Sequence, residues 1–238
     1  MLKIFIFAIG TIFGSFASLV VERSIRGESI VFPGSHCDSC GKSLKFYENI
    51  PILSFIFQGG RCRSCGAKIP PRFLIMEMLG GILILLATHY GLSLRAFMVF
   101  LSLLFALIIA LIDLRTMDIY MTYVYVLIGL GVIYRVLFRS FSIGYFKNIG
   151  IFTLLYLLVY FISQKSIGDG DLFFYLALSL FTRDSLFVYF CLISIWLGGI
   201  WGIFLLIKYR NRKMSMPFGI FIFLSYFIIS LLEVRIFL

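Results

Sequence analysis

Two aspartates in apolar surroundings are the residues of this sequence best suited to chemistry. Asp171 ends the run Ile-Gly-Asp-Gly-Asp and stands at the head of one apolar segment, whereas Asp113 closes another apolar segment far upstream. An acidic side chain in or beside hydrocarbon is costly unless it is paired or used, so such carboxylates are functional candidates. The pair is a candidate aspartyl dyad.

Two neighbouring carboxylates share a proton, so one can activate water as a base while its protonated partner donates to a carbonyl oxygen. This is the chemistry of peptide hydrolysis. Asp171 begins a helix, where the dipole favours an anion, and Asp113 ends one, so we hypothesise that Asp171 is the base. Gly168 and Gly170 would let that helix start irregularly and leave room for a substrate backbone. The alternative is that both carboxylates are capping or interfacial groups.

Four cysteines form two C-x2-C pairs separated by 21 residues, in the one long polar stretch of the chain, and they are Cys37, Cys40, Cys62 and Cys65. This is zinc-ribbon spacing, in which each pair bends a tight turn that aims two thiolates at one ion. Gly41 and Gly66 follow the pairs and permit the turns. Two disulfides are the alternative, but we place the loop in the reducing cytoplasm, where persistent disulfides are rare. We therefore expect structural zinc, which would supply much of the folding free energy of so short a loop.

The elements that must position these residues are membrane helices. Hydrophobic residues make up 61% of the 238 residues and charged residues 13%, which excludes a soluble globular domain. A spanning helix needs roughly 20 apolar residues. We predict an all-α polytopic membrane protein with about eight transmembrane helices and a small cytoplasmic zinc-ribbon-like loop. The predicted helices cover 2–22, 72–92, 94–114, 119–138, 144–164, 170–183, 185–208 and 217–237, of which the sixth is short.

The basic residues predict the orientation, because loops rich in Lys and Arg stay in the cytoplasm. One side of the predicted topology holds 14 of the 21 Lys and Arg residues. The first segment has no small-residue cleavage signal, so we expect a retained anchor whose N-terminus lies outside. The cytoplasmic loops are then 23–71, 115–118, 165–169 and 209–216, which puts Asp113 and Asp171 on the cytoplasmic face. These loops and anionic lipid headgroups explain the net charge of +10, so no nucleic-acid partner is expected.

In this order and spacing, the residues resemble those of the bacterial type IV prepilin peptidases, polytopic aspartyl proteases with a cytoplasmic zinc loop. The resemblance covers nearly the whole chain. It rests on Gly14-Ser-Phe16 with Arg23, the four cysteines, Glu48-Asn-Ile-Pro51, Gly60-Arg-Cys-Arg63, Arg72 with Glu77, Ile112-Asp113, Gly168 to Asp171, and Pro217-Phe-Gly219.

The resemblance implies cleavage of a short basic leader, after a glycine, from prepilin or pseudopilin precursors at the cytoplasmic face of the bacterial inner membrane. Asp113 and Asp171 would be catalytic. Such precursors serve type IV pili, type II secretion or competence. Many relatives also methylate the new N-terminus with S-adenosylmethionine. The expected domains are a first helix at 1–22, a zinc-binding loop at 23–71 and an aspartyl peptidase domain at 72–238.

Glu77 has three possible roles under this resemblance: contact with the charged N-terminal group of the substrate, contact with the methyl donor, or an ion pair with Arg72. Two positions depart from the family pattern. Ile119-Tyr-Met121 replaces a proline-containing segment after the first aspartate, and Ser18 stands where an asparagine is common. These departures put the local geometry and the methylation activity in question.

Two other classes of function stay open on the residues alone. In a proton-coupled transporter the paired aspartates would carry protons, although neither two related halves nor midplane carboxylates are evident. In a membrane scaffold the zinc loop would recruit a partner, which leaves the aspartates unexplained.

Overall fold

The computed structural model describes residues 1–162, 168–209 and 216–236. Some predicted features lie outside these residues: Lys165, Arg210, Arg212 and Lys213 of the cytoplasmic loops and the last residues of two predicted helices. The chain divides into two compact units, Met1–Leu92 and Ser93–Leu238. The three-domain division expected from the sequence stays a prediction.

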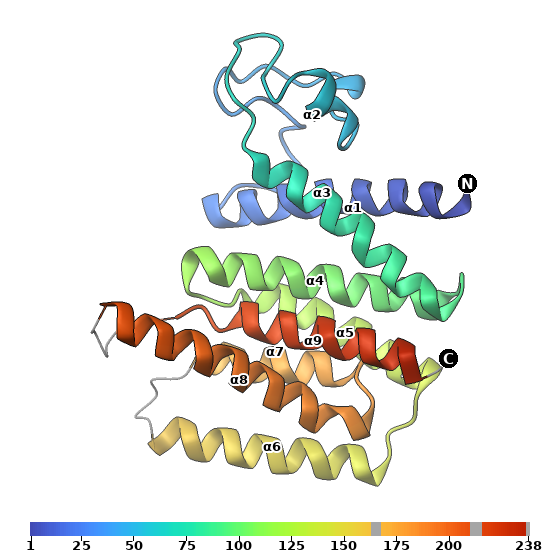
Figure 1. Ribbon diagram of the computed structural model, residues 1–238, viewed down its shortest axis with the longest axis vertical. Coiled ribbons are helices and arrows are strands. Elements are labelled where there is room, and N and C mark those ends of the chain that lie inside the picture. Colours follow the sequence, from blue (N-terminus) through green and yellow to red (C-terminus); the bar gives the residue numbers. More distant parts are fainter. Residues whose placement is uncertain (163–167, 210–215, 237–238) are drawn as a thin grey trace. The chain divides into compact units, whose positions relative to one another are not determined.

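The first unit holds two long helices, with the cysteine-containing loop between them (Figure 1). Its elements are α1 (Leu2–Arg26), η1 (Phe46–Glu48), α2 (Leu53–Phe57), α3 (Pro71–Ala87) and η2 (Thr88–Tyr90). Pro71 occupies the first turn of α3, where its missing N–H and fixed φ do no harm.

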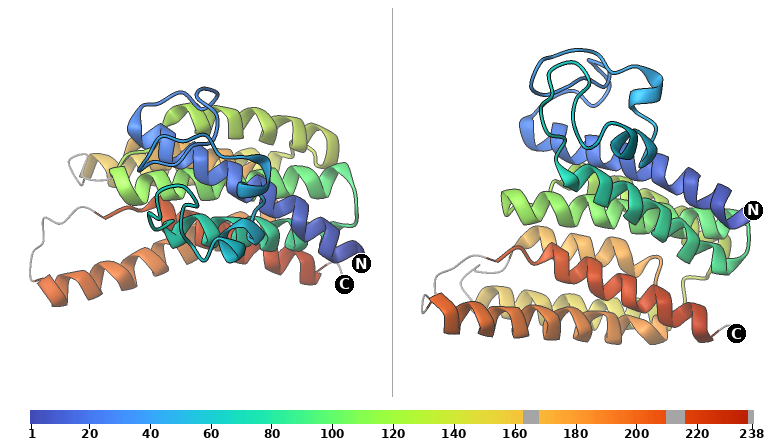
Figure 2. Two further views of the ribbon diagram at one scale, coloured as in Figure 1. Left: turned by 90° about the horizontal axis from the view of Figure 1, so that it is seen from above. Right: turned by 45° about the horizontal axis from the view of Figure 1, so that its top comes forward.

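The second unit is a bundle of helices that lie side by side (Figures 1 and 2). Its elements are α4 (Leu94–Thr116), α5 (Met121–Phe138), α6 (Ile143–Ile162), α7 (Asp169–Ser179), α8 (Asp184–Tyr209) and α9 (Gly219–Ile236). Each of the eight predicted apolar segments coincides with a helix of one of the two units, which confirms the all-α membrane fold.

The number of spans is a separate question from the number of helices. Among the described residues, five helices are long and apolar enough to cross a membrane: α1, α4, α5, α6 and α8. The predicted sixth span at 170–183 is only the 11-residue α7, which covers about 16 Å, roughly half of a hydrocarbon core of about 30 Å. The prediction of about eight spans therefore stays a prediction, and α7 by itself is too short to cross.

The end of α7 is fixed by a buried arginine of α5. The Arg135 side chain is 1% exposed, and its guanidinium donates to the carbonyl oxygens of Ser179 (3.3 Å) and Thr182 (3.4 Å). It also forms an ion pair with Asp184 and lies 3.4 Å from the ring centre of Tyr145. Helix C-termini leave carbonyl groups without intrahelical partners, so Arg135 satisfies that of Ser179 in α7 and that of Thr182 in the turn that follows.

Glycines bring α1 and α3 into close contact. A Cβ atom on Gly80 of α3 would lie 2.3 Å from the carbonyl oxygen of Gly10, and a Cβ on Gly14 would lie 2.3 Å from that of Met76. Gly10 and Gly14 are four residues apart on α1, the small-xxx-small spacing that lets membrane helices approach closely. The glycine of the Gly14-Ser-Phe16 motif therefore has a packing role.

Gly80→Ala is expected to lower the thermal unfolding midpoint in detergent, because the added methyl group meets backbone atoms of α1. Overpacking of this kind costs about 1–3 kcal/mol. The matched control is Gly199→Ala in α8, where nothing lies within 4 Å of the new Cβ. That control should keep or raise the midpoint, because alanine is the better helix former. Equal midpoints for the two variants would refute the close packing of α1 on α3.

Candidate active site and metal centre

Asp113 lies near the C-terminal end of α4 and is buried, with 5% of its surface exposed. Its Oδ2 atom accepts a hydrogen bond from the backbone N–H of Gly219 at 2.7 Å. Gly219 begins α9, so the donor is one of the N–H groups that a helix N-terminus leaves free. A Cβ on Gly219 would lie 2.9 Å from the same carboxylate oxygen. The approach of the two helix ends therefore depends on glycine at this position.

Asp171 lies in the first turn of α7 and is 8% exposed. The glycines beside it have separate roles. A Cβ on Gly168 would lie 3.2 Å from Oδ2 of Asp171, and a Cβ on Gly170 would lie 2.9 Å from Cβ of Ile119. Gly168 thus gives room to the carboxylate, and Gly170 gives room to the turn after α4. Room for a substrate backbone stays a prediction.

The two aspartates lie at the same end of the second unit. Both α4 and α7 pack against α9, and Figure 1 shows the C-terminal end of α4 on the same side as the N-terminal ends of α7 and α9. The carboxylates are near enough for the negative charge of Asp113 to act on Asp171. Asp113 and Asp171, which are 58 positions apart in the sequence (171 − 113), thus belong to one site.

The turn between α4 and α5 forms without the proline that the family pattern has there. Met117 adopts a left-handed conformation with φ 58°. The hydroxyl oxygen of Thr116 accepts a hydrogen bond from the N–H of Asp118 at 3.3 Å. Ile119 is buried and lies against Gly170. The departure at residues 119–121 therefore leaves a defined turn that packs against the start of α7.

Tyr156 is a residue of the site that the sequence analysis missed. Its hydroxyl, on α6, donates to the carbonyl oxygen of Gly168 at 2.7 Å. This bond holds the chain directly before α7 and so helps to position Asp171. A single tyrosine in a helix already rich in aromatic residues gives no sequence signal for such a role.

The four predicted cysteine ligands converge in the first unit. The sulfur atoms of Cys37, Cys40, Cys62 and Cys65 all lie within 4.8 Å of one another. The Cys37 and Cys65 sulfurs are 3.8 Å apart, and no disulfide joins any of the four. Tetrahedral zinc with bonds of about 2.3 Å sets its sulfur ligands about 3.8 Å apart. The donor set therefore fits a metal ion such as zinc.

The two cysteine pairs lie on two separate turns that have the same backbone hydrogen-bond pattern. The N–H of Cys37 donates to the carbonyl oxygen of Lys42, and that of Cys62 donates in the same way to Ala67. Gly41 and Gly66 have φ values of 68° and 71°, the left-handed backbone that glycine adopts readily.

The sulfur of Cys62 is prepared for deprotonation. Backbone N–H groups of Cys65 and Ser64 lower the pKa of its thiol to about 6, whereas burial and the neighbouring sulfurs raise the pKa of Cys65 to about 11. Metal binding requires the thiolate form, so these hydrogen bonds favour a metal ligand.

Arg23 organises the chain that leads to the first cysteine pair. Its buried guanidinium donates to four carbonyl oxygens of the segment 29–34, and these belong to Ser29 (3.0 Å), Ile30 (3.2 Å), Pro33 (2.6 Å) and Gly34 (3.2 Å). Nearby, Arg26 pairs with Asp38 at 2.9 Å, and this bond holds the pKa of that carboxyl below its usual range. Arg23 thus fixes the backbone of residues 29–34, which lead from α1 to the first cysteine pair.

Glu77 connects the loop to both helices of the first unit. Its Oε1 accepts a hydrogen bond from the hydroxyl of Ser15 on α1 at 2.9 Å, and its Oε2 accepts one from the N–H of Ile52 at 2.7 Å. Arg72, the pairing partner suggested by the sequence, instead forms an ion pair with Glu22 at 3.0 Å. Contact of Glu77 with substrate or methyl donor stays a prediction.

Cys65→Ser is expected to remove the bound metal, because three thiolates and a hydroxyl bind zinc far more weakly than four thiolates. Elemental analysis of the purified protein should show about one zinc ion per wild-type chain and far less in the variant. Cys191→Ser, in α8, is the matched control and should keep the metal. Equal zinc contents for wild type and Cys65→Ser would refute the metal site.

Comparison with known proteins matches each unit to a family. The bacterial peptidase A24 N-terminal domain matches residues 8–90, which lie within the first unit. The type IV leader peptidase family matches residues 98–203, which lie within the second.

Several relatives carry names of the same kind. A prepilin leader peptidase/N-methyltransferase of Myxococcus xanthus is 38% identical over 80 residues, 34% of this chain and 24% of the relative. One of Klebsiella pneumoniae with the same name is 34% identical over 121 residues, 47% of this chain and 52% of the relative. A type 4 prepilin-like proteins leader peptide-processing enzyme of Escherichia coli is 30% identical over 97 residues, 33% of this chain and 36% of the relative.

These matches cover about half or less of the length of each relative. No solved structure matches the chain. The two domain matches and the named relatives agree with the motifs and with the two-unit fold, and together they show that the chain is related to the type IV prepilin peptidases.

Proposed function

We propose that this protein is a membrane aspartyl endopeptidase that removes the basic leader from type IV prepilin-like precursors. The observation that carries the proposal is the burial of Asp113 and Asp171 at one end of the second unit, within electrostatic reach of each other. The names of the relatives support this substrate class.

Hydrolysis by this pair needs one proton shared between two carboxylates. The ionised aspartate would take a proton from water as the water attacks the scissile carbonyl carbon. The protonated aspartate would donate to the carbonyl oxygen, and proton return to the leaving amine would complete cleavage of the peptide bond. The hydrogen bond from Gly219 to Asp113 and the glycines around Asp171 would fix the two carboxylates for this work.

The hypothesis that Asp171 is the base rests on the position of Asp171 at a helix N-terminus and of Asp113 at a helix C-terminus. However, Asp113 also accepts a hydrogen bond from the N-terminal N–H of α9. Each carboxylate thus has a helix N-terminus beside it, so the dipole argument no longer separates the two aspartates.

The proposed location is the bacterial inner membrane, with the N-terminus outside and the site on the cytoplasmic side. The distribution of basic residues supports this orientation. The zinc loop would then lie in the cytoplasm, where thiols stay reduced. Its proposed role is to stabilise the first unit and to help position the leader of the precursor.

N-methylation of the new N-terminus with S-adenosylmethionine is a second proposed activity. Two of the relatives are named N-methyltransferases. Both oxygens of Glu77, for which contact with the methyl donor is one of the three roles that the sequence leaves open, already accept hydrogen bonds within the first unit. We therefore assign no residue to binding of the methyl donor. The rival proposal of a proton-coupled transporter uses the same aspartates, but the names of the relatives favour hydrolysis.

Asp113→Asn and Asp171→Asn are each expected to lower cleavage of a pilin-like precursor in membranes by at least about 100-fold, because each removes a general acid or base. The measurement is the mass of the precursor before and after incubation, which also reveals an added methyl group. The matched control is Asp169→Asn, two positions before Asp171 and exposed. It should cleave at nearly the wild-type rate. Cleavage that survives either of the first two substitutions would exclude the dyad.

Gly219→Ala is expected to slow the same reaction strongly, because its methyl group would come within 2.9 Å of Oδ2 of Asp113. The carboxylate must then move away from its backbone donor. Gly202→Ala in α8 is the control, since nothing lies within 4 Å of a Cβ there. If both variants cleave equally well, the contact between Gly219 and Asp113 does not position the site.

A further inference from the structure

An apolar stretch in the cysteine-containing loop is not explained by metal binding. Residues 50–57 read Ile-Pro-Ile-Leu-Ser-Phe-Ile-Phe and contain no charge. Leu53, Ile56 and Phe57 share one face of α2 at the i, i+3, i+4 spacing, and all three are exposed. Phe46 of η1, which packs beside α2, is 88% exposed. Contiguous apolar surface of this kind marks a site of contact.

The contacts of Glu77 place this stretch beside the membrane helices. Glu77 accepts hydrogen bonds from Ser15 of α1 and from the backbone of Ile52. Ser15 lies eleven residues before Arg26, where α1 ends (26 − 15), a distance of about 16 Å along the helix. The start of α2 is therefore level with the middle of α1, well before its C-terminal end. Figures 1 and 2 show the loop along the flank of α1 and α3 in each view.

The backbone conformation of Ile52 indicates that specific contacts hold the start of α2 beside α1. Ile52 has φ 63°, a conformation that a β-branched residue avoids. Such strain persists only where the surroundings over-determine it. The N–H of Leu53 closes this turn onto the carbonyl oxygen of Pro51 at 2.6 Å, and the 2.7 Å hydrogen bond from the Ile52 N–H to the buried Glu77 carboxylate ties the turn to α3.

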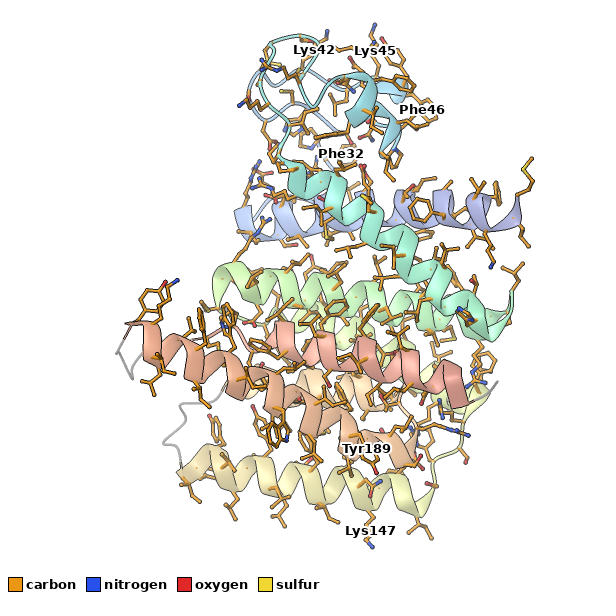
Figure 3. The ribbon with its side chains drawn as sticks, viewed as in Figure 1. Phe32, Lys42, Lys45, Phe46, Lys147 and Tyr189 are labelled. Carbon is orange, nitrogen blue, oxygen red and sulfur yellow. The ribbon has the colours of Figure 1, made fainter. Side chains whose placement is uncertain are left out.

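The charges of the loop favour a lipid surface as the partner that covers this exposed apolar face. Asp38 is paired with Arg26, and Glu48 accepts from the backbone N–H of Lys45. Figure 3 shows Lys42 and Lys45 at the outer rim of the loop and Phe46 on its flank. Exposed aromatic and aliphatic side chains bordered by lysine are the composition of elements that lie in the interface of anionic membranes.

We propose that residues 50–57, together with Phe46, insert into the bilayer beside α1 and α3, and that Glu77 is the tether that holds them there. The apolar face of α2 then continues the lipid-facing surface of α1, where Ile12 and Phe16 are exposed. This proposal does not depend on the reaction that the second unit performs.

The experiment places a single tryptophan on the inserted face. Phe57→Trp is introduced into a chain that carries Trp196→Phe and Trp201→Phe, and the protein is reconstituted in anionic vesicles made with acyl-chain-brominated lipid. We expect the emission of Trp at position 57 to fall by about half relative to vesicles without bromine. Lys42→Trp in the same background is the control and should lose little emission. Leu53→Trp, on the same face, is a second reporter in case one variant does not fold.

Equal emission at positions 53 and 57 with and without bromine would overturn the insertion. Protection of both positions from brominated lipid and also from aqueous iodide would overturn it too, because a protein surface would then cover the face. Glu77→Ala in the Phe57→Trp chain tests the tether separately. Quenching should weaken toward the level of the Lys42→Trp control, and unchanged quenching would show that Glu77 does not hold the segment.

Discussion

Three helix ends must meet at one place in the second unit, and the site depends on this constraint. The C-terminus of α4 brings Asp113, the N-terminus of α7 brings Asp171, and the N-terminus of α9 brings the free N–H of Gly219. A buried carboxylate needs donors, because an unpaired charge in a low-dielectric interior is costly. Helix N-termini are the natural source, since their first N–H groups have no intrahelical partners. At this junction Asp113 receives its backbone donor from Gly219, with no charged side chain needed for that bond.

The short length of α7 is consistent with the requirement that its N-terminus meet the ends of α4 and α9. A helix of about 16 Å cannot reach both faces of a core about 30 Å thick. Its far end is held by Arg135 through the carbonyl oxygens of Ser179 and Thr182. With that end fixed near the start of α8, the length of α7 sets the position of its N-terminus, where Asp171 is buried. A longer helix would carry the same carboxylate out of the bundle toward the surface.

Sequence reasoning found the residues whose chemistry is visible in their type. Aspartates in apolar segments stand out because burial of a carboxylate is costly, and cysteines at zinc-ribbon spacing stand out because that spacing suits one tetrahedral ion. Sequence reasoning did not find Tyr156, Arg135 or the bond between Gly219 and Asp113. Each of these acts through a contact between residues of different helices or helix ends, and neither periodicity nor spacing encodes such contacts. The end of α7 was missed for the same reason, because apolar residues continue to Phe181 while a tertiary contact from α5 ends the helix earlier.

Glu77 illustrates how a polar residue in a membrane helix can have a structural role that its sequence neighbours do not suggest. Arg72 and Glu77 are five residues apart, a spacing that places them on different sides of a helix, and Arg72 pairs with Glu22. Glu77 turns instead toward α1 and the loop, where Ser15 and Ile52 supply one donor to each carboxylate oxygen. An acid in this place joins two helices and a metal-binding loop through a single side chain. The glycine contacts of α1 with α3 bring Ser15 close enough for the bond to form, so helix packing and loop placement in the first unit depend on each other.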